Sequence, residues 1–110
     1  MPRQDLLVRI TPQGDTVTIT LAGEAHFDFD TAEKHIHQVL AHKPRHVIVN
    51  AAGLSFMSSV GMCFLINLRR AVKDAGGTMQ LVALQPLVKQ SLEHARVIHL
   101  FEVVPEAPPT

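Results

Sequence analysis

A short apolar run between two stretches of helical periodicity restricts the possible folds of this chain more than any other feature. The run is Val47-Ile48-Val49, and all three of its residues are β-branched. Such a run is typical of a strand covered on both faces, as in sheets built from strand–helix–strand crossovers. Apolar side chains recur at helical spacing on either side of it, in residues 30–43 and 59–75. The sequence therefore predicts helices that connect parallel strands of one sheet.

The chain before this run predicts a β-hairpin and a loop. Residues 6–11 and 16–21 alternate apolar and polar side chains, and residues 12–15 between them contain a proline and a glycine. Alternation with a period of two is typical of half-buried strands, and the glycine favours a tight turn. Residues 23–30 follow no single period. We expect them to form a loop that ends at Asp30, the predicted N-cap of the first helix.

The chain after the run completes a single domain. Residues 79–84 and 97–104 are predicted strands, and the helix between them begins at Pro86, a residue type favoured in a first helical turn. The expected fold class is α/β, in the order β-β-α-β-α-β-α-β, with a mixed, mostly parallel sheet and helices packed on it. Residues 1–104 form one predicted domain, and residues 105–110 form a predicted disordered, proline-rich tail. The predicted core consists of Val17, Ile19, Leu21, Ile36, Leu40, Val47, Val49, Leu65, Leu68, Val72, Leu81 and Leu92.

The composition argues against several classes of partner. The 110 residues include ten basic and ten acidic ones but no Trp or Tyr, which disfavours a nucleic-acid-binding surface. No apolar run is long enough to span a bilayer, and the polar N-terminus does not resemble a signal peptide. Cys63 is the single cysteine, so no disulfide can form within the chain. We therefore expect a cytoplasmic protein that neither binds nucleic acid nor inserts into a membrane.

Two adjacent hydroxyl side chains, Ser58 and Ser59, lie where the buried strand leads into the following helix. Backbone N–H groups at the start of a helix lack partners within the helix, and they stabilise anionic oxygens. A serine at this point is therefore either an N-cap or a residue that accepts phosphate. The residue pattern leaves both alternatives open.

The helix after these serines has an unusual solvent face. At about 100° per residue, its basic side chains share one arc with Met62, Cys63 and Ile66, and Ser59 projects in the same direction. Apolar residues rimmed by charged ones are typical of a protein-binding surface. The alternative is that Met62 and Ile66 pack beneath a neighbouring loop or strand of the same domain.

Together these segments resemble the STAS domain family (sulfate transporter and anti-sigma factor antagonist), and in particular its stand-alone bacterial anti-sigma factor antagonists. Residues 21–24, LAGE, are similar to the family's Gly-Glu turn after the second strand. Residues 47–50, followed by LSFMSSVG at residues 54–61, resemble its signature strand and phosphorylation loop. Residues 76–81 resemble the strand after its long helix, and residues 86–101 resemble its last helix and strand.

The resemblance implies a regulatory protein that has no catalytic activity or cofactor and that acts by exchanging partners. Similar proteins bind an anti-sigma factor, a serine kinase of the histidine-kinase-like ATPase type, and thereby free a sigma factor. The kinase phosphorylates a serine of the domain, the complex dissociates, and a phosphatase restores the serine. Ser59 occupies the matching position, with Ser58 as the alternative acceptor. The residues expected to contact the partner are Gly23, Glu24, His26, Phe56, Met57, Ser58, Ser59, Met62, Cys63, Ile66 and Arg70.

Three positions depart from the family pattern. Ser58 stands where many members have an aspartate before the phosphorylated serine, and His26 stands where many have an aspartate after the Gly-Glu turn. Arg96 stands where a glycine usually ends the last helix. Because both aspartates lie close to the serine in such domains, their absence supports an alternative function. In that alternative the chain is an accessory subunit that docks on a transport ATPase or another signalling partner without being phosphorylated.

Other chemistries have less support in the sequence. Seven histidines suggest a metal site, but His35 and His37 lie two residues apart on a helix, and no set of ligands has the usual spacing. Cys63 fits a small apolar role better than that of a redox thiol. The serines lack the Gly-x-Ser-x-Gly context of a hydrolase nucleophile. We therefore expect neither a metal site nor an enzyme.

Overall fold

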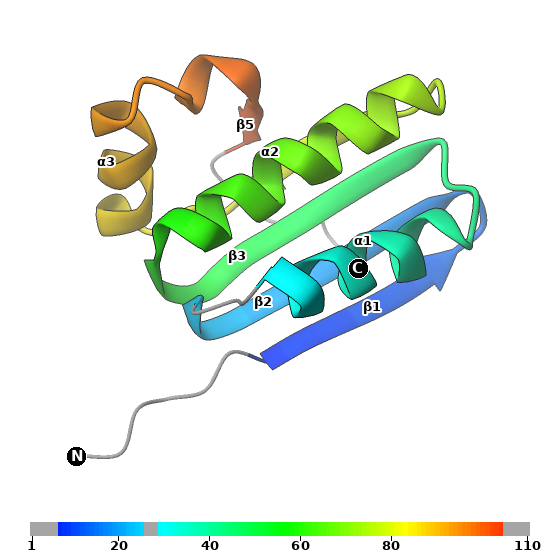
Figure 1. Ribbon diagram of the computed structural model, residues 1–110, viewed down its shortest axis with the longest axis horizontal. Coiled ribbons are helices and arrows are strands. Elements are labelled where there is room, and N and C mark those ends of the chain that lie inside the picture. The colour runs from blue at the N-terminus through cyan, green and yellow to red at the C-terminus, as the bar shows by residue number, and fades with distance from the viewer. Residues whose placement is uncertain (1–6, 26–28, 105–110) are drawn as a thin grey trace.

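The computed structural model describes residues 7–25 and 29–104, except for the side chains of residues 24, 25 and 29. Within them, strands and helices alternate after an initial hairpin (Figure 1). The strands are β1 (Leu7–Gln13), β2 (Thr16–Ala25), β3 (His46–Met57), β4 (Thr78–Val82) and β5 (Glu102–Val104). The helices are α1 (Phe29–Leu40), α2 (Ser59–Asp74) and α3 (Pro86–His94), followed by a 3-10 turn, η1 (Ile98–Leu100). Leu6 and the predicted tail at residues 105–110 lie outside the described residues.

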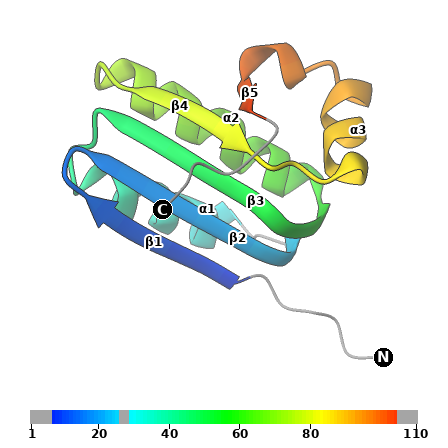
Figure 2. The ribbon, with the colours of Figure 1, turned by 180° about the vertical axis from the view of Figure 1, so that it is seen from behind.

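The five described strands form one sheet in the order β1-β2-β3-β4-β5. β1 and β2 are antiparallel, and the other neighbouring pairs are parallel. α1 and α2 lie side by side on one face of the sheet, and Figure 2 shows the strands from the opposite face, with both helices behind them. α3 lies near the end of the sheet that β3 reaches at Met57. The predicted fold class, a mixed and mostly parallel sheet with helices packed on it, is confirmed.

The hydrophobic core lies between this sheet and the helices α1 and α2. Inward-facing side chains of successive strands, such as Ile19, Val49 and Leu81, are completely buried, and each stabilises the fold by about 1.5–3 kcal/mol. Ten of the twelve predicted core residues are buried, whereas Ile36 and Leu40 are only half-buried. Both of these side chains line a groove between α1 and α2, where the two helices leave them partly uncovered.

β2 and β3 extend further than the sequence predicts. Residues 23–25, which were expected to form a loop, continue β2. Residues 51–57 continue β3, although the family resemblance implies a loop from residue 54. The pairing of the two strands changes register between Thr20 and Ala22, and again between Gly23 and Glu24. An irregularity of this kind interrupts the alternation of side chains between the two faces of a strand. The loop prediction for residues 23–25 was wrong because it depended on that alternation, whereas the loop at residues 54–57 was implied by the family resemblance.

Two further boundaries differ from the predictions. α1 begins at Phe29, so Asp30 lies inside its first turn and is not its N-cap. A carboxylate in the first turn still interacts favourably with the helix dipole. The predicted strand at residues 97–104 is interrupted by η1, and only Glu102–Val104 pair with β4. Consecutive backbone hydrogen bonds of 3.0 and 3.1 Å close this turn, and a short apolar run is compatible with either conformation.

Arg96 ends α3 in a left-handed backbone conformation, with a φ of 59°. Its N–H donates a hydrogen bond to the carbonyl of Glu93 at 3.0 Å, and the N–H of Val97 donates one to the carbonyl of Leu92 at 3.1 Å. These two bonds form a Schellman cap. Gly76 ends α2 with a φ of 85°, a conformation that glycine adopts without strain. Arg96 therefore occupies a position that favours glycine.

Candidate functional site

Ser58 is the N-cap of α2. Its hydroxyl accepts a hydrogen bond from the N–H of Gly61 at 3.2 Å, and its carbonyl accepts one from the N–H of Met62 at 3.0 Å. Its backbone is extended, with φ −77° and ψ 172°, as is usual for the residue before a first helical turn. The half-buried hydroxyl of Ser58 is therefore engaged in closing the helix. The capping role belongs to Ser58 and not to Ser59.

Ser59 is the first residue of α2, and it is exposed. Its hydroxyl forms no hydrogen bond with another residue in the described part of the chain. The first turn of α2 contains no acidic residue, so no carboxylate of that turn opposes negative charge at this position. The backbone N–H groups at the helix start favour an anionic group there. Ser59 is thus accessible, and its surroundings on α2 are compatible with phosphate.

The end of β2 lies beside the residues that precede α2. Gly23 and Glu24 pair with Leu54 and Phe56 across the parallel ladder between β2 and β3. Gly23 is buried and has a φ of 93°, which favours glycine. The hydroxyl of Ser55 donates a hydrogen bond to the carbonyl of Gly23 at 3.1 Å and joins the two strands at this point. The structure therefore brings the Gly-Glu segment and the 54–61 segment together.

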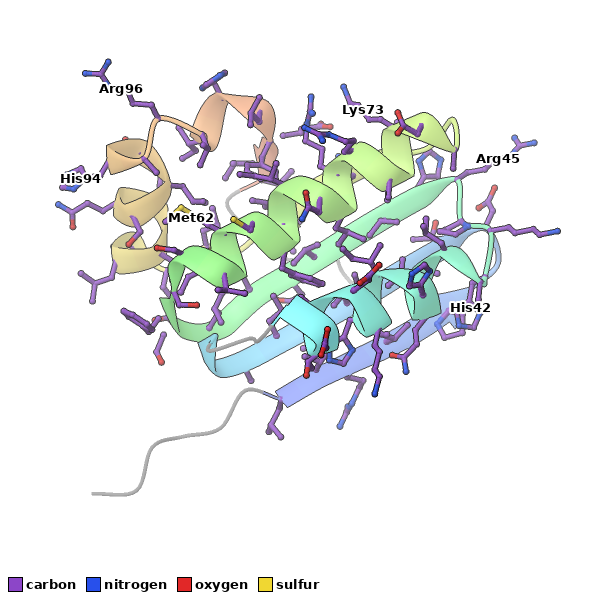
Figure 3. The ribbon with its side chains drawn as sticks, in the orientation of Figure 1. His42, Arg45, Met62, Lys73, His94 and Arg96 are labelled. Atoms are coloured by element: carbon purple, nitrogen blue, oxygen red, sulfur yellow. The ribbon has the colours of Figure 1, made fainter. Side chains whose placement is uncertain are left out.

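The outer face of α2 continues from Ser59 along the helix. Cys63 and Arg70 are exposed, whereas Met62 and Ile66 are half-buried and pack against the edge of the core. Met62 lies near the start of the helix (Figure 3). The alternative in which Met62 and Ile66 are covered by their own domain therefore holds only in part. The face combines partly accessible apolar side chains with an exposed serine and an exposed cation.

A groove of about 510 Å³ runs between α1 and α2. Half-buried and buried apolar side chains line it, including Ile36 and Phe64, together with the exposed Cys63 and Arg70. Arg70 follows Ser59 by eleven positions, which corresponds to about 16 Å along the helix. At that separation, Arg70 does not contact a group attached to Ser59, so the two residues mark opposite ends of the outer face.

The sequence analysis missed Leu87 as a candidate contact residue. Leu87 on α3 is 68% exposed, and with Phe56, which is 47% exposed, it lines a groove of about 300 Å³ between the end of β3 and α3. The available signal was its position outside the apolar stripe that Val88 and Leu92 form on the buried side of α3. A large apolar residue outside such a stripe indicates an exposed apolar surface.

One side chain drops out of the predicted contact surface. Met57 is only 5% exposed and belongs to the hydrophobic core. Almost none of its side chain is therefore accessible to a partner. His26 and the side chain of Glu24 lie outside the described residues, and their predicted contacts stay predictions. Among the described side chains, no group of three or more histidine, cysteine or acidic residues is placed to hold a metal ion.

Comparisons with known proteins agree with this architecture. The family model for the STAS domain matches residues 8–107. An anti-sigma factor antagonist from Mycobacterium paratuberculosis has a TM-score of 0.76 and 18% identity, with 92% of this chain and 86% of that chain covered. The Bacillus cell fate determinant SpoIIAA in its phosphorylated form has a TM-score of 0.66 and 20% identity, covering 88% and 90%. A sulfate transporter family protein from Wolinella succinogenes has a TM-score of 0.70 and 15% identity, covering 87% and 81%.

The chain belongs to the STAS domain family, because the family model spans almost all of it. The resemblance found in the sequence is thereby confirmed. At these identities the solved structures establish a shared fold alone. One of the three is an anti-sigma factor antagonist, one is a cell fate determinant, and one is a sulfate transporter family protein. None of the helices within residues 7–25 and 29–104 combines the length and apolar character needed to cross a membrane.

Proposed function

We propose that this chain is an anti-sigma factor antagonist, a protein-binding module without enzymatic activity that is switched by phosphorylation of Ser59. The observation that carries the proposal is the difference between the two serines: Ser58 caps α2, and Ser59 is exposed beside it. Family membership and the fold shared with an anti-sigma factor antagonist support it. The proposed partner is an anti-sigma factor and serine kinase of the histidine-kinase-like ATPase type, with a phosphatase that reverses the modification in the cytoplasm.

The contact surface proposed for this partner surrounds Ser59. It includes the residues expected from the sequence, with Leu87 added and the buried side chain of Met57 removed. Its members are Gly23, Glu24, His26, Phe56, Ser58, Ser59, Met62, Cys63, Ile66, Arg70 and Leu87.

Phosphorylation would change this surface much more than it changes the fold. A phosphate on Ser59 adds about −1.5 to −2 charges at neutral pH. The start of α2 accommodates this charge, because the N-terminal end of a helix dipole favours an anion and the first turn lacks acidic residues. A partner packed on Met62 and Ile66 would have to bury the same charge. Burying an unpaired charge is costly, so the modified protein is expected to release its partner while staying folded.

Affinity capture from the host, with identification of the bound proteins, tests the proposed partner. The wild-type chain is expected to retain an anti-sigma factor kinase, and Ser59→Asp is expected to weaken that binding at least about tenfold through the added charge. Gln13→Glu is the matched control, since it adds one negative charge to the exposed end of β1, at the end of the sheet opposite Ser59. Equal capture by Ser59→Asp and wild type would contradict the proposal.

Phosphorylation itself is tested with the captured kinase and ATP. The tryptic peptide that covers residues 46–69 contains Ser55, Ser58 and Ser59, so fragment ions must assign the modified residue. We expect modification of Ser59, and we expect Ser59→Ala to remain bound to the kinase after ATP is added. An unmodified peptide, or modification confined to Ser58, would rule out the proposed switch.

A second candidate function is that of an accessory STAS subunit that docks on a transport ATPase without phosphorylation. It is favoured by Ser58, which stands where an acid is common in the family, and by the shared fold with a sulfate transporter family protein. In this case capture from the host recovers a transport ATPase, and Ser59→Ala supports function as well as wild type does. Together, these two results would contradict the proposed phosphorylation switch and support the accessory-subunit function.

A further inference from the structure

A basic cavity lies at the end of the molecule opposite Ser59. It has a volume of about 700 Å³ and is formed by the connection between α1 and β3 together with the turn between α2 and β4. Lys43, Arg45 and His46 line it, and none of the side chains that the structure assigns to its wall is acidic. Figure 3 shows Arg45 at this end of the molecule and Arg96 at the other.

Among the described residues, no carboxylate forms an ion pair with the cations of this cavity. Lys43 and Arg45 are both exposed, and neither forms an ion pair with another described residue. Lys73, in the last turn of α2, adds a positive charge at the same end. Two acidic residues of the described part of the chain lie at this end: Asp15 in the β1–β2 turn, and Asp74, which lines the groove between α1 and α2 instead of this cavity.

Helix electrostatics explain only part of this charge distribution. Lys43 follows the end of α1 and Lys73 lies in the last turn of α2, where a cation interacts favourably with the helix dipole. Arg45 lies beyond that region, directly before the first residue of β3. Stabilisation of a helix end therefore does not account for the charge of Arg45.

Backbone hydrogen bonds from neighbouring segments hold the cavity wall in place. The N–H groups of Arg45 and His46 both donate to the carbonyl of Asp15, at 2.7 and 3.2 Å, and the N–H of Thr78 donates to the carbonyl of Arg45 at 2.8 Å. The Nδ1 atom of His46 lies 2.7 Å from the hydroxyl of Thr78. A Cβ atom placed on Gly77 would lie 2.9 Å from the carbonyl oxygen of Arg45, so the α2–β4 turn packs directly against this backbone. A ligand would therefore find the backbone already ordered, which favours binding.

We propose that this cavity binds a small phosphorylated anion that carries at least two negative charges. Its volume lies within the range of about 300–1,000 Å³ that is typical of small-molecule sites. The guanidinium of Arg45 matches two phosphate oxygens at once, and the ammonium of Lys43 adds a second charge-assisted contact. The site is independent of the proposed function, because α2 separates Ser59 from Lys73 by about 21 Å.

Calorimetric titration of the full chain with orthophosphate, pyrophosphate and tripolyphosphate tests the site at low salt. We expect affinity to rise with the number of phosphates and to fall as salt is added, because the contacts are electrostatic. The double variant Lys43→Gln/Arg45→Gln is expected to lose at least about tenfold in affinity for tripolyphosphate. The double variant Lys89→Gln/Arg96→Gln removes the same charge at the α3 end, and its affinity is expected to stay that of wild type.

Several results would overturn the proposal. One is the absence of saturable binding of tripolyphosphate. Another is an equal loss of affinity for tripolyphosphate in both double variants, which would mean that only the net charge of the protein matters. Melting temperatures of both variants are measured alongside, because a folded Lys43→Gln/Arg45→Gln protein with unchanged affinity excludes the site.

The source of the phosphate is tested by sedimentation with lipid vesicles that contain or lack a phosphoinositide. Co-sedimentation that depends on Lys43 and Arg45 assigns the phosphate to a lipid headgroup. Binding of tripolyphosphate without co-sedimentation assigns it to a ligand free in solution.

Discussion

The hydroxyl of Ser55 on β3 donates a hydrogen bond to the carbonyl of Gly23 on β2 at 3.1 Å, beside a change of register between the two strands. The residues directly after each partner, Glu24 and Phe56, both belong to the proposed contact surface. This bond is thus a side-chain link between the two halves of that surface. Its loss should affect both folding and partner binding.

Ser55→Ala is expected to lower the free energy of unfolding by about 1 kcal/mol, which is typical for the loss of one hydrogen bond. Urea denaturation measures the change, and hydrogen exchange should become faster at the end of β2. The matched control is Ser91→Ala, which removes a bond of 3.0 Å to the carbonyl of Leu87 within α3. We expect that control to change stability by less than about 0.5 kcal/mol, because alanine has the higher helix propensity. Equal changes in the free energy of unfolding for the two substitutions would show that the Ser55 bond contributes no more to stability than a bond within a helix.

Ser58→Ala and Ser59→Ala are expected to separate capping from signalling. Ser58→Ala should lower the free energy of unfolding by about 1 kcal/mol, because the N–H of Gly61 loses its acceptor. Ser59→Ala should change it by less than about 0.5 kcal/mol, since the side chain is exposed and does not cap the helix. Chemical denaturation of both variants checks this difference. A larger loss in Ser59→Ala than in Ser58→Ala would reverse the two roles.

Arg96→Gly is expected to raise the free energy of unfolding by about 1 kcal/mol, because a side chain is strained at a φ of 59° and glycine is not. The reciprocal substitution is Gly76→Ala at a φ of 85°, where no atom lies within 4 Å of the added Cβ. It should lower stability by about 1–2 kcal/mol through backbone strain alone. Thermal denaturation of the two variants should therefore give shifts of opposite sign. Shifts of the same sign would mean that side-chain contacts decide stability at these helix ends.

Gly77→Ala is expected to be destabilising for a different reason, namely lack of space. The added Cβ would lie 2.9 Å from the carbonyl oxygen of Arg45 and 3.0 Å from a methyl carbon of Val72. We expect a loss of about 1–3 kcal/mol and weaker binding of tripolyphosphate, because the α2–β4 turn must move away from the cavity wall. Denaturation and calorimetry on the same variant measure both effects. Wild-type affinity in a clearly destabilised Gly77→Ala protein would show that the cavity does not depend on this contact.

Elements with uninterrupted periodicity could be predicted from the sequence. The hairpin, the strand at Val47–Val49, α2 and the helix that begins at Pro86 follow from local alternation, helical spacing and a helix-start residue. The extensions of β2 and β3 could not be predicted in this way, because their side-chain pattern depends on register shifts between two strands. The half-burial of Ile36 could not be predicted either, because it depends on how α1 and α2 are placed relative to each other.

The candidate site was predictable to a similar extent. Exposure of Ser59 and Cys63 follows from the helical wheel, and the structure places both on the solvent side of α2. The separate role of Ser58 did not follow, because two adjacent serines at a helix start are equivalent until the first helical residue is known. Leu87 and Phe56 meet across a groove only through the packing of α3 against β3, which local sequence does not reveal.

With α2 closed by Ser58, the neighbouring hydroxyl can gain or lose a covalent group without loosening the helix. Proteases recognise locally unfolded segments, and none would be created by either form. If Ser59 is phosphorylated as proposed, the half-life of the polypeptide should therefore be the same in both forms, and one molecule could pass through many cycles of modification before it is degraded.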